Sequence, residues 1–232
     1  MAKKPTVPIK VTAHLKDGRL ISTDGIIMLD AVLYHAWFYK YAPGVLRGED
    51  EDSYDGYIGL PLRQLPGNRY VASRGIYEEL DRHVEHYNKY PDFFRAGKMQ
   101  HLDMDKGQIS SGVGLYRNYR NPVVVRTVKG SKITFWAMGN PEAVSDLLSR
   151  IPAVGKKPSM GWGIVDGWTV EEAADDYSLW HPEYGLMRPE PVEKADKRAA
   201  QGRYPIMMYG VHPPYWKACN ARLCYVPIGG GR

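Results

Sequence analysis

The sequence predicts an α+β fold with a βαββαβ core, a long insertion and a C-terminal extension. Three observations support this. Residues 9–15 alternate between apolar and polar side chains, apolar residues recur at helical spacing over 29–41, and a strand, helix and strand follow one another over 133–170. This order is that of the ferredoxin-like or RRM-type fold.

The first strand and helix have clear patterns. In residues 9–15 the apolar positions are Ile9, Val11, Ala13 and Leu15. Asp17-Gly18 then signals a turn. The predicted helix 29–41 has one apolar face made of Leu29, Val32, Leu33, Ala36 and Trp37. Its opposite face carries Tyr34, Phe38 and Tyr41, so we expect cover on both sides, by the insertion or by a partner protein.

The middle of the chain predicts one helix and three strands. Residues 57–62 predict a short strand with Pro61 at an edge or at an end. Residues 77–89 predict an amphipathic helix that buries Ile76, Leu80, Val84 and Tyr87. On its wet face, Glu78–Arg82 and Glu85–Lys89 would form i,i+4 pairs. Residues 122–128 and 133–138 predict two strands joined by a turn at Lys129-Gly130-Ser131.

The second helix of the βαββαβ core is predicted at 141–150, with Asn140 as N-cap and Pro141 at the first helical position. It would bury Val144, Leu147, Leu148 and Ile151. Strands at 164–170 and 204–211 follow. We therefore divide the chain into a core, 1–170, and a C-terminal extension, 171–232. The core contains an insertion, 63–132, which is too long for an ordinary connection.

Between the second helix and the strand 164–170 lies the sequence Gly155-Lys156-Lys157-Pro158-Ser159-Met160-Gly161-Trp162-Gly163, called the glycine loop below. Glycine lets the backbone approach a ligand closely, and lysines with exposed N–H groups favour phosphate. Trp162 could stack on a base or lie in the core. The alternative is a turn with solvated lysines. A P-loop is excluded, because the glycine and lysine spacing and the helix-to-strand order both differ.

Charge is segregated along the chain. The net charge is +5, from 31 basic and 26 acidic residues. Residues 113–132 and 197–232 contain no acid, whereas acids gather at 49–52 and 171–176. Such a positive surface attracts polyanions, although the arginines could instead pair with acids of other segments. We favour nucleic acid, and the candidate contacts outside the glycine loop are Arg117, Arg120, Arg126 and Arg203.

Several other classes are disfavoured. There is no apolar run of bilayer length and no secretory h-region, so we expect a cytoplasmic protein without membrane contact. The two cysteines, Cys219 and Cys224, indicate a reducing compartment. With His212 they make a poor zinc set, and two buried thiols are the simpler expectation. We expect no metal and no cofactor. The aromatic run 209–216 could be a base platform, a partner surface or core packing.

Residues 27–33, the glycine-containing run 107–119 and the glycine loop together resemble the CRISPR RAMP proteins. Within them they resemble the Cas-five-like subunit of type IV CRISPR systems, the third Csf subunit. The resemblance extends over about 9–225.

This resemblance implies a non-catalytic subunit that caps the 5′ handle of crRNA and nucleates the backbone filament of an RNA-guided DNA-targeting complex. Its partners would be a Cas-seven-like backbone subunit, a large subunit and target DNA near the flanking motif. Guide pairing would supply the sequence specificity. The insertion 63–132 would correspond to the thumb. Lys156 and Lys157 would hold phosphates, with the amides of Gly161 and Gly163 close to the RNA.

Two alternatives remain open. Some RAMP relatives cleave precursor crRNA, and here His35 or Tyr34 would be the general base with Lys156 as the cation. The chain could also be a protein-interaction module without RNA binding, which the two-sided first helix suggests.

Overall fold

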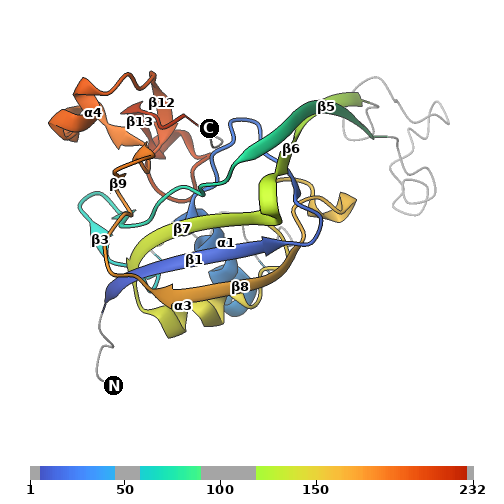
Figure 1. The fold of residues 1–232 in the computed structure, drawn as a ribbon, viewed down its shortest axis with the longest axis horizontal. Coiled ribbons are helices and arrows are strands. Elements are labelled where there is room, and N and C mark those ends of the chain that lie inside the picture. Colours follow the sequence, from blue (N-terminus) through green and yellow to red (C-terminus); the bar gives the residue numbers. More distant parts are fainter. Residues whose placement is uncertain (1–5, 45–57, 90–118, 229–232) are drawn as a thin grey trace, which may run out of the picture.

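The computed structural model describes residues 6–44, 58–89 and 119–228. It is a mixed α/β structure with mostly antiparallel sheets and few helices. In the central sheet, β1 (Val7–Leu15) lies between β7 (Lys132–Gly139) and β8 (Val165–Glu172), and both pairings are antiparallel (Figure 1). The far edge of β7 receives a further stretch of chain through isolated bridges at Leu62, Ala72 and Ile76.

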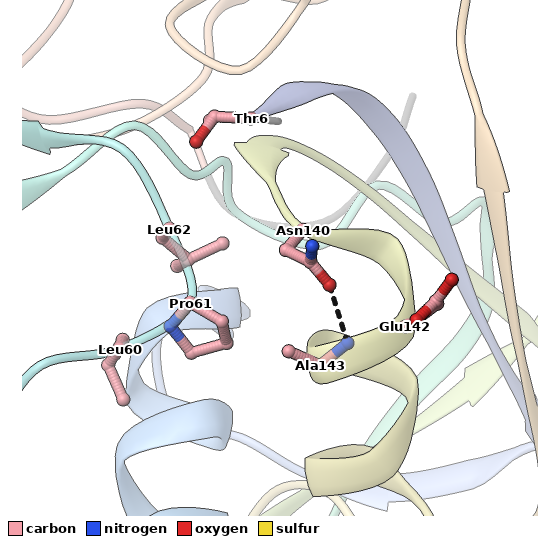
Figure 2. Close-up of a pocket in the computed structure, with 7 residues that line it drawn as sticks. All are labelled: Thr6, Leu60, Pro61, Leu62, Asn140, Glu142 and Ala143. Carbon is pink, nitrogen blue, oxygen red and sulfur yellow. Dashed lines mark hydrogen bonds between the residues drawn. The ribbon is translucent and has the colours of Figure 1, made fainter. Parts of the chain in front are cut away.

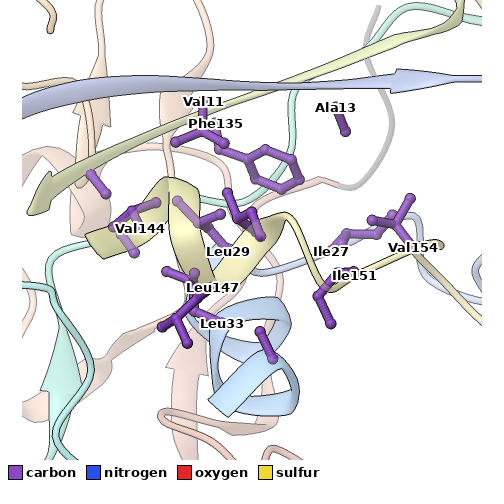
Figure 3. Close-up of a cluster of buried hydrophobic side chains, with 14 of the residues drawn as sticks. Val11, Ala13, Ile27, Leu29, Leu33, Phe135, Val144, Leu147, Ile151 and Val154 are labelled. Carbon is purple, nitrogen blue, oxygen red and sulfur yellow. The ribbon is translucent and has the colours of Figure 1, made fainter. Parts of the chain in front are cut away.

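Two helices, α1 (Leu29–Tyr41) and α3 (Pro141–Leu148), pack on one face of this sheet. Figure 3 shows Leu29 and Leu33 of α1 and Val144 of α3 gathered below Val11 and Phe135 of the sheet. Both helices were predicted, and so was the core face of α3. The N-cap prediction is also confirmed, because the Asn140 side chain accepts the backbone N–H of Ala143 at 2.8 Å.

The second apolar face of α1 is covered in part by the chain itself. Phe38 is buried and joins the same core cluster as Ile58 and Leu60. Tyr34 packs edge-on against Phe38, with their ring centroids 5.0 Å apart. Tyr41, one turn further on, remains 56% exposed.

A second sheet contains β2 (Arg19–Ile21), β6 (Tyr119–Val128) and β5 (Glu79–Lys89), in the order β2-β6-β5. Strands β5 and β6 form a long ribbon that extends away from the central sheet (Figure 1). The turn predicted between β6 and β7 is confirmed as a short 3₁₀ segment, η3 (Lys129–Ser131).

The helix predicted at 77–89 is wrong, because this segment is the strand β5. Leu80 and Val84, which were expected to be buried, are 60% and 57% exposed. Although the spacing of a few apolar side chains is that of a helix, the strand is more stable because it pairs with the β-branched residues of β6. Of the predicted pairs, Glu78 contacts Lys129 and Arg82 contacts Glu79 instead.

The strand predicted at 57–62 is also not found as such. Residue 57 lies outside the described residues, and the rest of the segment contributes only the single bridge at Leu62. A short hairpin of β3 (Gln64–Leu65) and β4 (Arg69–Tyr70) follows.

The C-terminal part adds two small sheets. One pairs β9 (Trp180–His181) with β10 (Gly185–Leu186). The other has the order β11-β13-β12. Its bounds and those of the short helices are β11 (Glu190–Pro191), η5 (Val192–Lys194), α4 (Lys197–Gln201), β12 (Ile206–Gly210), η6 (Ala218–Asn220) and β13 (Ala221–Tyr225). The strand predicted at 204–211 is thus confirmed as β12.

A buried ion pair ties this C-terminal part to α1. Asp30 and Arg188 are both fully buried, with Nη2 and Oδ2 3.6 Å apart. The Tyr215 hydroxyl donates to the Asp30 carboxylate at 2.8 Å. Burial raises the pKa of Asp30, and the guanidinium of Arg188 and the Tyr215 hydroxyl oppose that rise. Arg188 also donates to the carbonyl groups of Tyr70 and Val211. Asp30 is therefore an architectural residue.

Within the described ranges, no helix has the length and apolar character needed to cross a bilayer.

Candidate nucleic-acid interface

The backbone of the glycine loop is held in a left-handed conformation at four positions. These are Gly155 (φ +83°), Lys157 (φ 59°), Gly161 (φ +87°) and Gly163 (φ +66°). A Cβ at Gly163 would overlap the carbonyl oxygen of Val154, and one at Gly155 would lie 2.7 Å from that of Ile21. Glycine is required there for space as well as for φ, whereas a Cβ at Gly161 would meet no atom of the described residues within 4 Å.

Backbone hydrogen bonds connect both ends of the loop to β2. The N–H of Lys156 donates to the carbonyl of Ile21 at 2.9 Å, and that of Gly163 donates to the carbonyl of Arg19 at 2.8 Å. The N–H of Gly161 donates to the carbonyl of Pro158. Both N–H groups therefore donate within the chain, and the prediction that the amides of Gly161 and Gly163 lie close to the RNA stays a prediction.

Trp162 belongs to the core of this region. It is 8% exposed and packs in a small cluster with Ile21 and Val125, while the guanidinium of Arg19 lies 4.7 Å from its ring centroid. Its indole Nε1 is buried and has no hydrogen-bond partner among the described residues. Of the two interpretations, core packing is confirmed. The prediction that Trp162 contacts RNA is wrong, because its ring is not accessible to a base.

The remaining side chains of the loop face solvent. Lys156, Ser159 and Met160 are exposed and Lys157 is half-buried. The Lys156 ammonium donates to the Thr23 hydroxyl at 3.2 Å, which leaves further N–H donors for a ligand. The Lys157 ammonium lies 4.2 Å from the ring centroid of Tyr87 in β5. The two lysines thus stand where the loop meets β2 and the ribbon.

Arg126 serves the structure rather than a ligand. It is 2% exposed, forms an ion pair with Glu79, and donates to the carbonyl groups of Ser22 at 2.8 Å and Thr23 at 3.1 Å. The prediction that it holds a phosphate at the surface is wrong. Because it holds the backbone of Thr23, it supports the hydroxyl that Lys156 contacts.

Of the other predicted arginines, the structure describes two, Arg120 and Arg203, and they lie in different parts of the molecule. Arg120 is exposed on β6, opposite Asn88 in the ribbon. Arg203 is exposed just after α4, which Figure 1 draws at the other end of the molecule from the ribbon. Arg117 lies outside the described residues.

A cavity of about 540 Å³ opens beside the first residues of the loop. Its volume falls in the range of small-molecule sites. Aliphatic side chains of α1 and of the chain around it form much of the wall, and Lys156 stands among the polar groups. The lining residues are Ile21, Ser22, Thr23, Asp24, Ile26, Ile27, Met28, Ala31, Val32, His35, Ile151, Ala153, Val154, Gly155, Lys156, Tyr209 and Tyr215.

The polar groups of this cavity are fixed by hydrogen bonds. Tyr209 of β12 donates to the Asp24 carboxylate at 2.7 Å, and burial raises the pKa of Tyr209, so this hydroxyl stays protonated. Burial lowers the pKa of His35, so its imidazole is neutral at pH 7. Sequence reasoning singled out His35 and the aromatic run that supplies Tyr209, but it missed Asp24. The polar turn Ser22-Thr23-Asp24-Gly25 before α1 was the available signal.

A second cavity of about 540 Å³ lies at the N-terminus of α3 (Figure 2). Its lining residues are Thr6, Leu60, Pro61, Leu62, Asn140, Glu142 and Ala143. Glu142 is the one charged residue among them, whereas the cavity beside the glycine loop contains the cation Lys156 in addition to the carboxylate of Asp24, and a cation favours a polyanion. The cavity beside the glycine loop is therefore the better nucleic-acid candidate.

The cysteines do not form a site. Cys224 is buried, and burial raises its pKa to about 11, whereas Cys219 is exposed. The expectation of two buried thiols is thus right for Cys224 and wrong for Cys219. In the part of the chain that the structure describes, no cluster of His, Cys, Asp and Glu could hold a metal ion.

Comparison with known proteins gives one family. No curated protein matches the chain. The family model described as CRISPR type IV associated protein Csf3 matches residues 7–227, which include both larger sheets, the glycine loop and the C-terminal part. Since the match extends over nearly the whole chain, this protein belongs to the Csf3 family of CRISPR type IV associated proteins.

Proposed function

We propose that this protein is a non-catalytic crRNA-binding subunit of a type IV CRISPR effector complex, in which it caps the 5′ handle of the guide and nucleates the backbone filament for RNA-guided DNA targeting. Family membership supports a role in a type IV CRISPR complex with other Csf subunits. The observation that carries the proposal is a pair of lysines on a rigidly held loop beside a cavity of about 540 Å³.

The rigid loop suits phosphate binding. Gly155 and Gly163 allow the backbone to lie against Ile21 and Val154, and hydrogen bonds to β2 hold both ends. Lys156 and Lys157 therefore start from a fixed backbone, and less entropy is lost when RNA binds. Phosphate contacts of this kind supply most of the affinity for a polynucleotide.

The cavity suits a nucleotide next to those phosphates. Single-stranded RNA is commonly bound by bases that leave the stack and meet aromatic rings and polar groups. Here an aliphatic wall, the rings of His35 and Tyr209 and the carboxylate of Asp24 surround a space that begins at Lys156. A base in the cavity would leave its phosphate at the loop.

We interpret the core as a ferredoxin-like or RRM-type fold of the RAMP kind. In this interpretation the bridged segment 62–76 takes the position of the second strand, at the edge of β7, and the sheet order agrees with that plan. The ribbon of β5 and β6 then belongs to the thumb-like insertion.

The first test replaces the two loop cations. We expect Lys156→Ala with Lys157→Ala to weaken binding of handle RNA. The slope of log affinity against log salt should flatten by about 1.4, since each phosphate contact on a single strand contributes about 0.7. Filter binding across a salt series measures both quantities.

The matched control is Lys194→Ala with Lys197→Ala, which removes the same charge from exposed positions near α4. Its slope should equal that of the unchanged protein. An unchanged slope in the loop variant, or an equal loss in both variants, would contradict the role of Lys156 and Lys157.

A second candidate function is cleavage of precursor crRNA without a metal. The observation that favours it is that His35 and Lys156 line the same cavity, with the His35 pKa lowered by burial, as a general base requires. Tyr34 is not among the lining residues. Incubation with precursor crRNA in EDTA separates the two functions: cleavage that His35→Ala abolishes supports the nuclease, and intact RNA supports the non-catalytic subunit.

A third class, a protein-interaction module, predicts that the protein purifies without RNA from cells that express the CRISPR array. The proposed function predicts a short co-purifying RNA with a uniform 5′ end.

A further inference from the structure

The small C-terminal sheet exposes an apolar face. Ile206 and Met208 of β12 and Leu223 of β13 are 53%, 63% and 51% exposed. Met208 lies directly opposite Leu223 in the antiparallel register, and Ile206 lies opposite Tyr225. Directly opposed residues share a face of the sheet, so these side chains form one patch, called the β12 patch below. Contiguous exposed apolar residues of this kind mark interaction surfaces.

The same strand has an open edge. The sheet order is β11-β13-β12, so within the described residues β12 is hydrogen-bonded to a neighbouring strand on one side only. An exposed edge strand with apolar side chains is a template for another extended chain. Backbone hydrogen bonds would give such a chain affinity, and its alternate side chains would meet the patch.

Charge around the patch favours an acidic partner. Residues 197–232 include no Asp or Glu, and the exposed Arg203 lies just before β12. The most exposed residues of the patch, Ile206, Met208 and Leu223, have no ring for stacking and no donor for phosphate, and Tyr225 on the same face is half-buried, which argues against RNA on the patch itself. Strand β12 itself contains no charged residue, so the β12 of a second copy of this chain would offer Arg203 no acidic partner.

We propose that β12 is a docking strand for another protein subunit of the type IV complex. The bound segment is extended, pairs with the open edge of β12, places apolar side chains on the β12 patch and carries Asp or Glu beside Arg203. This inference goes beyond crRNA binding, because it requires no residue of the glycine loop and no RNA.

The experiment co-expresses the tagged chain with the other Csf subunits, without a CRISPR array, and measures which subunits are captured. We expect Met208→Glu with Leu223→Glu to lower capture at least tenfold, because charged groups replace the apolar contacts. The control, Leu80→Glu with Val84→Glu, changes two equally exposed residues of the ribbon and should leave capture intact. Equal loss in both variants, or capture that neither variant affects, would overturn the proposal.

Three further readouts distinguish the occupants. Hydrogen exchange should show new protection of residues 206–210 when the captured subunit is bound, and no change there would refute strand pairing. Light scattering on the chain alone should give a monomer, and a dimer that Met208→Glu dissociates would assign the patch to a second copy. Handle RNA should bind Met208→Glu with Leu223→Glu as tightly as the unchanged chain, and a matching loss of RNA binding would assign the patch to RNA instead.

Discussion

The two halves of the glycine loop differ in what surrounds them. The anchored residues, Gly155, Trp162 and Gly163, lie against β2 and β6 and have their space or their amides used by the chain. The residues between them, from Lys156 to Met160, are mostly exposed. Their side-chain contacts with other segments include those of Lys156 with Thr23 and of Lys157 with Tyr87.

Residues that hold the fold together and residues that are open to solvent therefore alternate within nine positions. A buried side chain that is already packed or bonded contributes to the free energy of unfolding, whereas an exposed cation on a fixed backbone is available to a ligand. The arginines of the molecule divide in the same way, since Arg126 and Arg188 are buried in hydrogen bonds while Arg120 and Arg203 are exposed.

The largest expected effect is that of Trp162→Ala. Removal of this buried ring should lower the free energy of unfolding by about 3–5 kcal/mol, because it leaves a cavity against Ile21 and Val125. Met160→Ala, at an exposed position two residues earlier, should change it by no more than about 0.5 kcal/mol. Urea unfolding followed by circular dichroism measures both. Similar values for the two variants would remove the distinction between the halves.

The next effect compares two glycines of the loop that share a positive φ. Gly163→Ala should cost about 2–5 kcal/mol, since the new methyl group would overlap the carbonyl oxygen of Val154 in addition to the cost of φ. Gly161→Ala should cost only the conformational part, about 1–2 kcal/mol, because no atom in the described part of the chain lies within 4 Å of its Cβ position. Thermal unfolding of the pair would sharpen the boundary between anchored and exposed residues, and equal losses would contradict it.

The smallest effect concerns two histidines with opposite surroundings. Partial burial at the edge of the cavity lowers the pKa of His35 below its ordinary 6.5, whereas hydrogen bonds from the ring of His83 to Glu85 and Asp81 raise the pKa of His83 above 6.5. As the pH falls, His83 should therefore take up its proton before His35. An NMR titration of the two imidazole rings would show this order, and the reverse order would refute it.

The two shifts act on stability with opposite signs. The His35 contribution is present above the unfolded pKa and is lost as the pH falls through 6.5 and below. The His83 contribution is fully present below 6.5 and is lost as the pH rises through the raised folded pKa. Asp81→Asn with Glu85→Gln should return the His83 pKa toward its ordinary value and leave that of His35 unchanged.

Much of the central sheet and its helices could be predicted from the sequence. Period-two alternation in β1, the apolar face of α1 and the Asn140-Pro141 start of α3 are local signals, and each reports its own element. The strand β5 could not be predicted in this way. This segment forms a strand because it pairs with β6, which begins at Tyr119, thirty residues after the end of β5 at Lys89. Leu80 and Val84 match helical spacing, yet they belong to an exposed face of a ribbon.

The candidate site likewise has features that the sequence could predict and features that depend on tertiary contacts. Composition identified Lys156, Lys157 and the need for glycine, because these depend on residue type. It could not tell that Arg126 is buried or that the Gly163 amide donates to Arg19, because both facts depend on how β2 and β6 meet the loop. Asp24 and Tyr209, 185 residues apart, meet only through the fold.

Strand β12 has a consequence for how the complex would assemble. One of its faces supplies Tyr209 to the cavity wall, where it holds Asp24, and its other face carries Ile206 and Met208 outward. An occupant on either face restrains the same five-residue strand. The binding of guide RNA and that of the partner subunit would then be thermodynamically linked. If bound RNA changes the affinity for the subunit by some factor, the bound subunit changes the affinity for RNA by the same factor. If this factor raises the affinity, the partner subunit would bind preferentially to chains that already carry RNA.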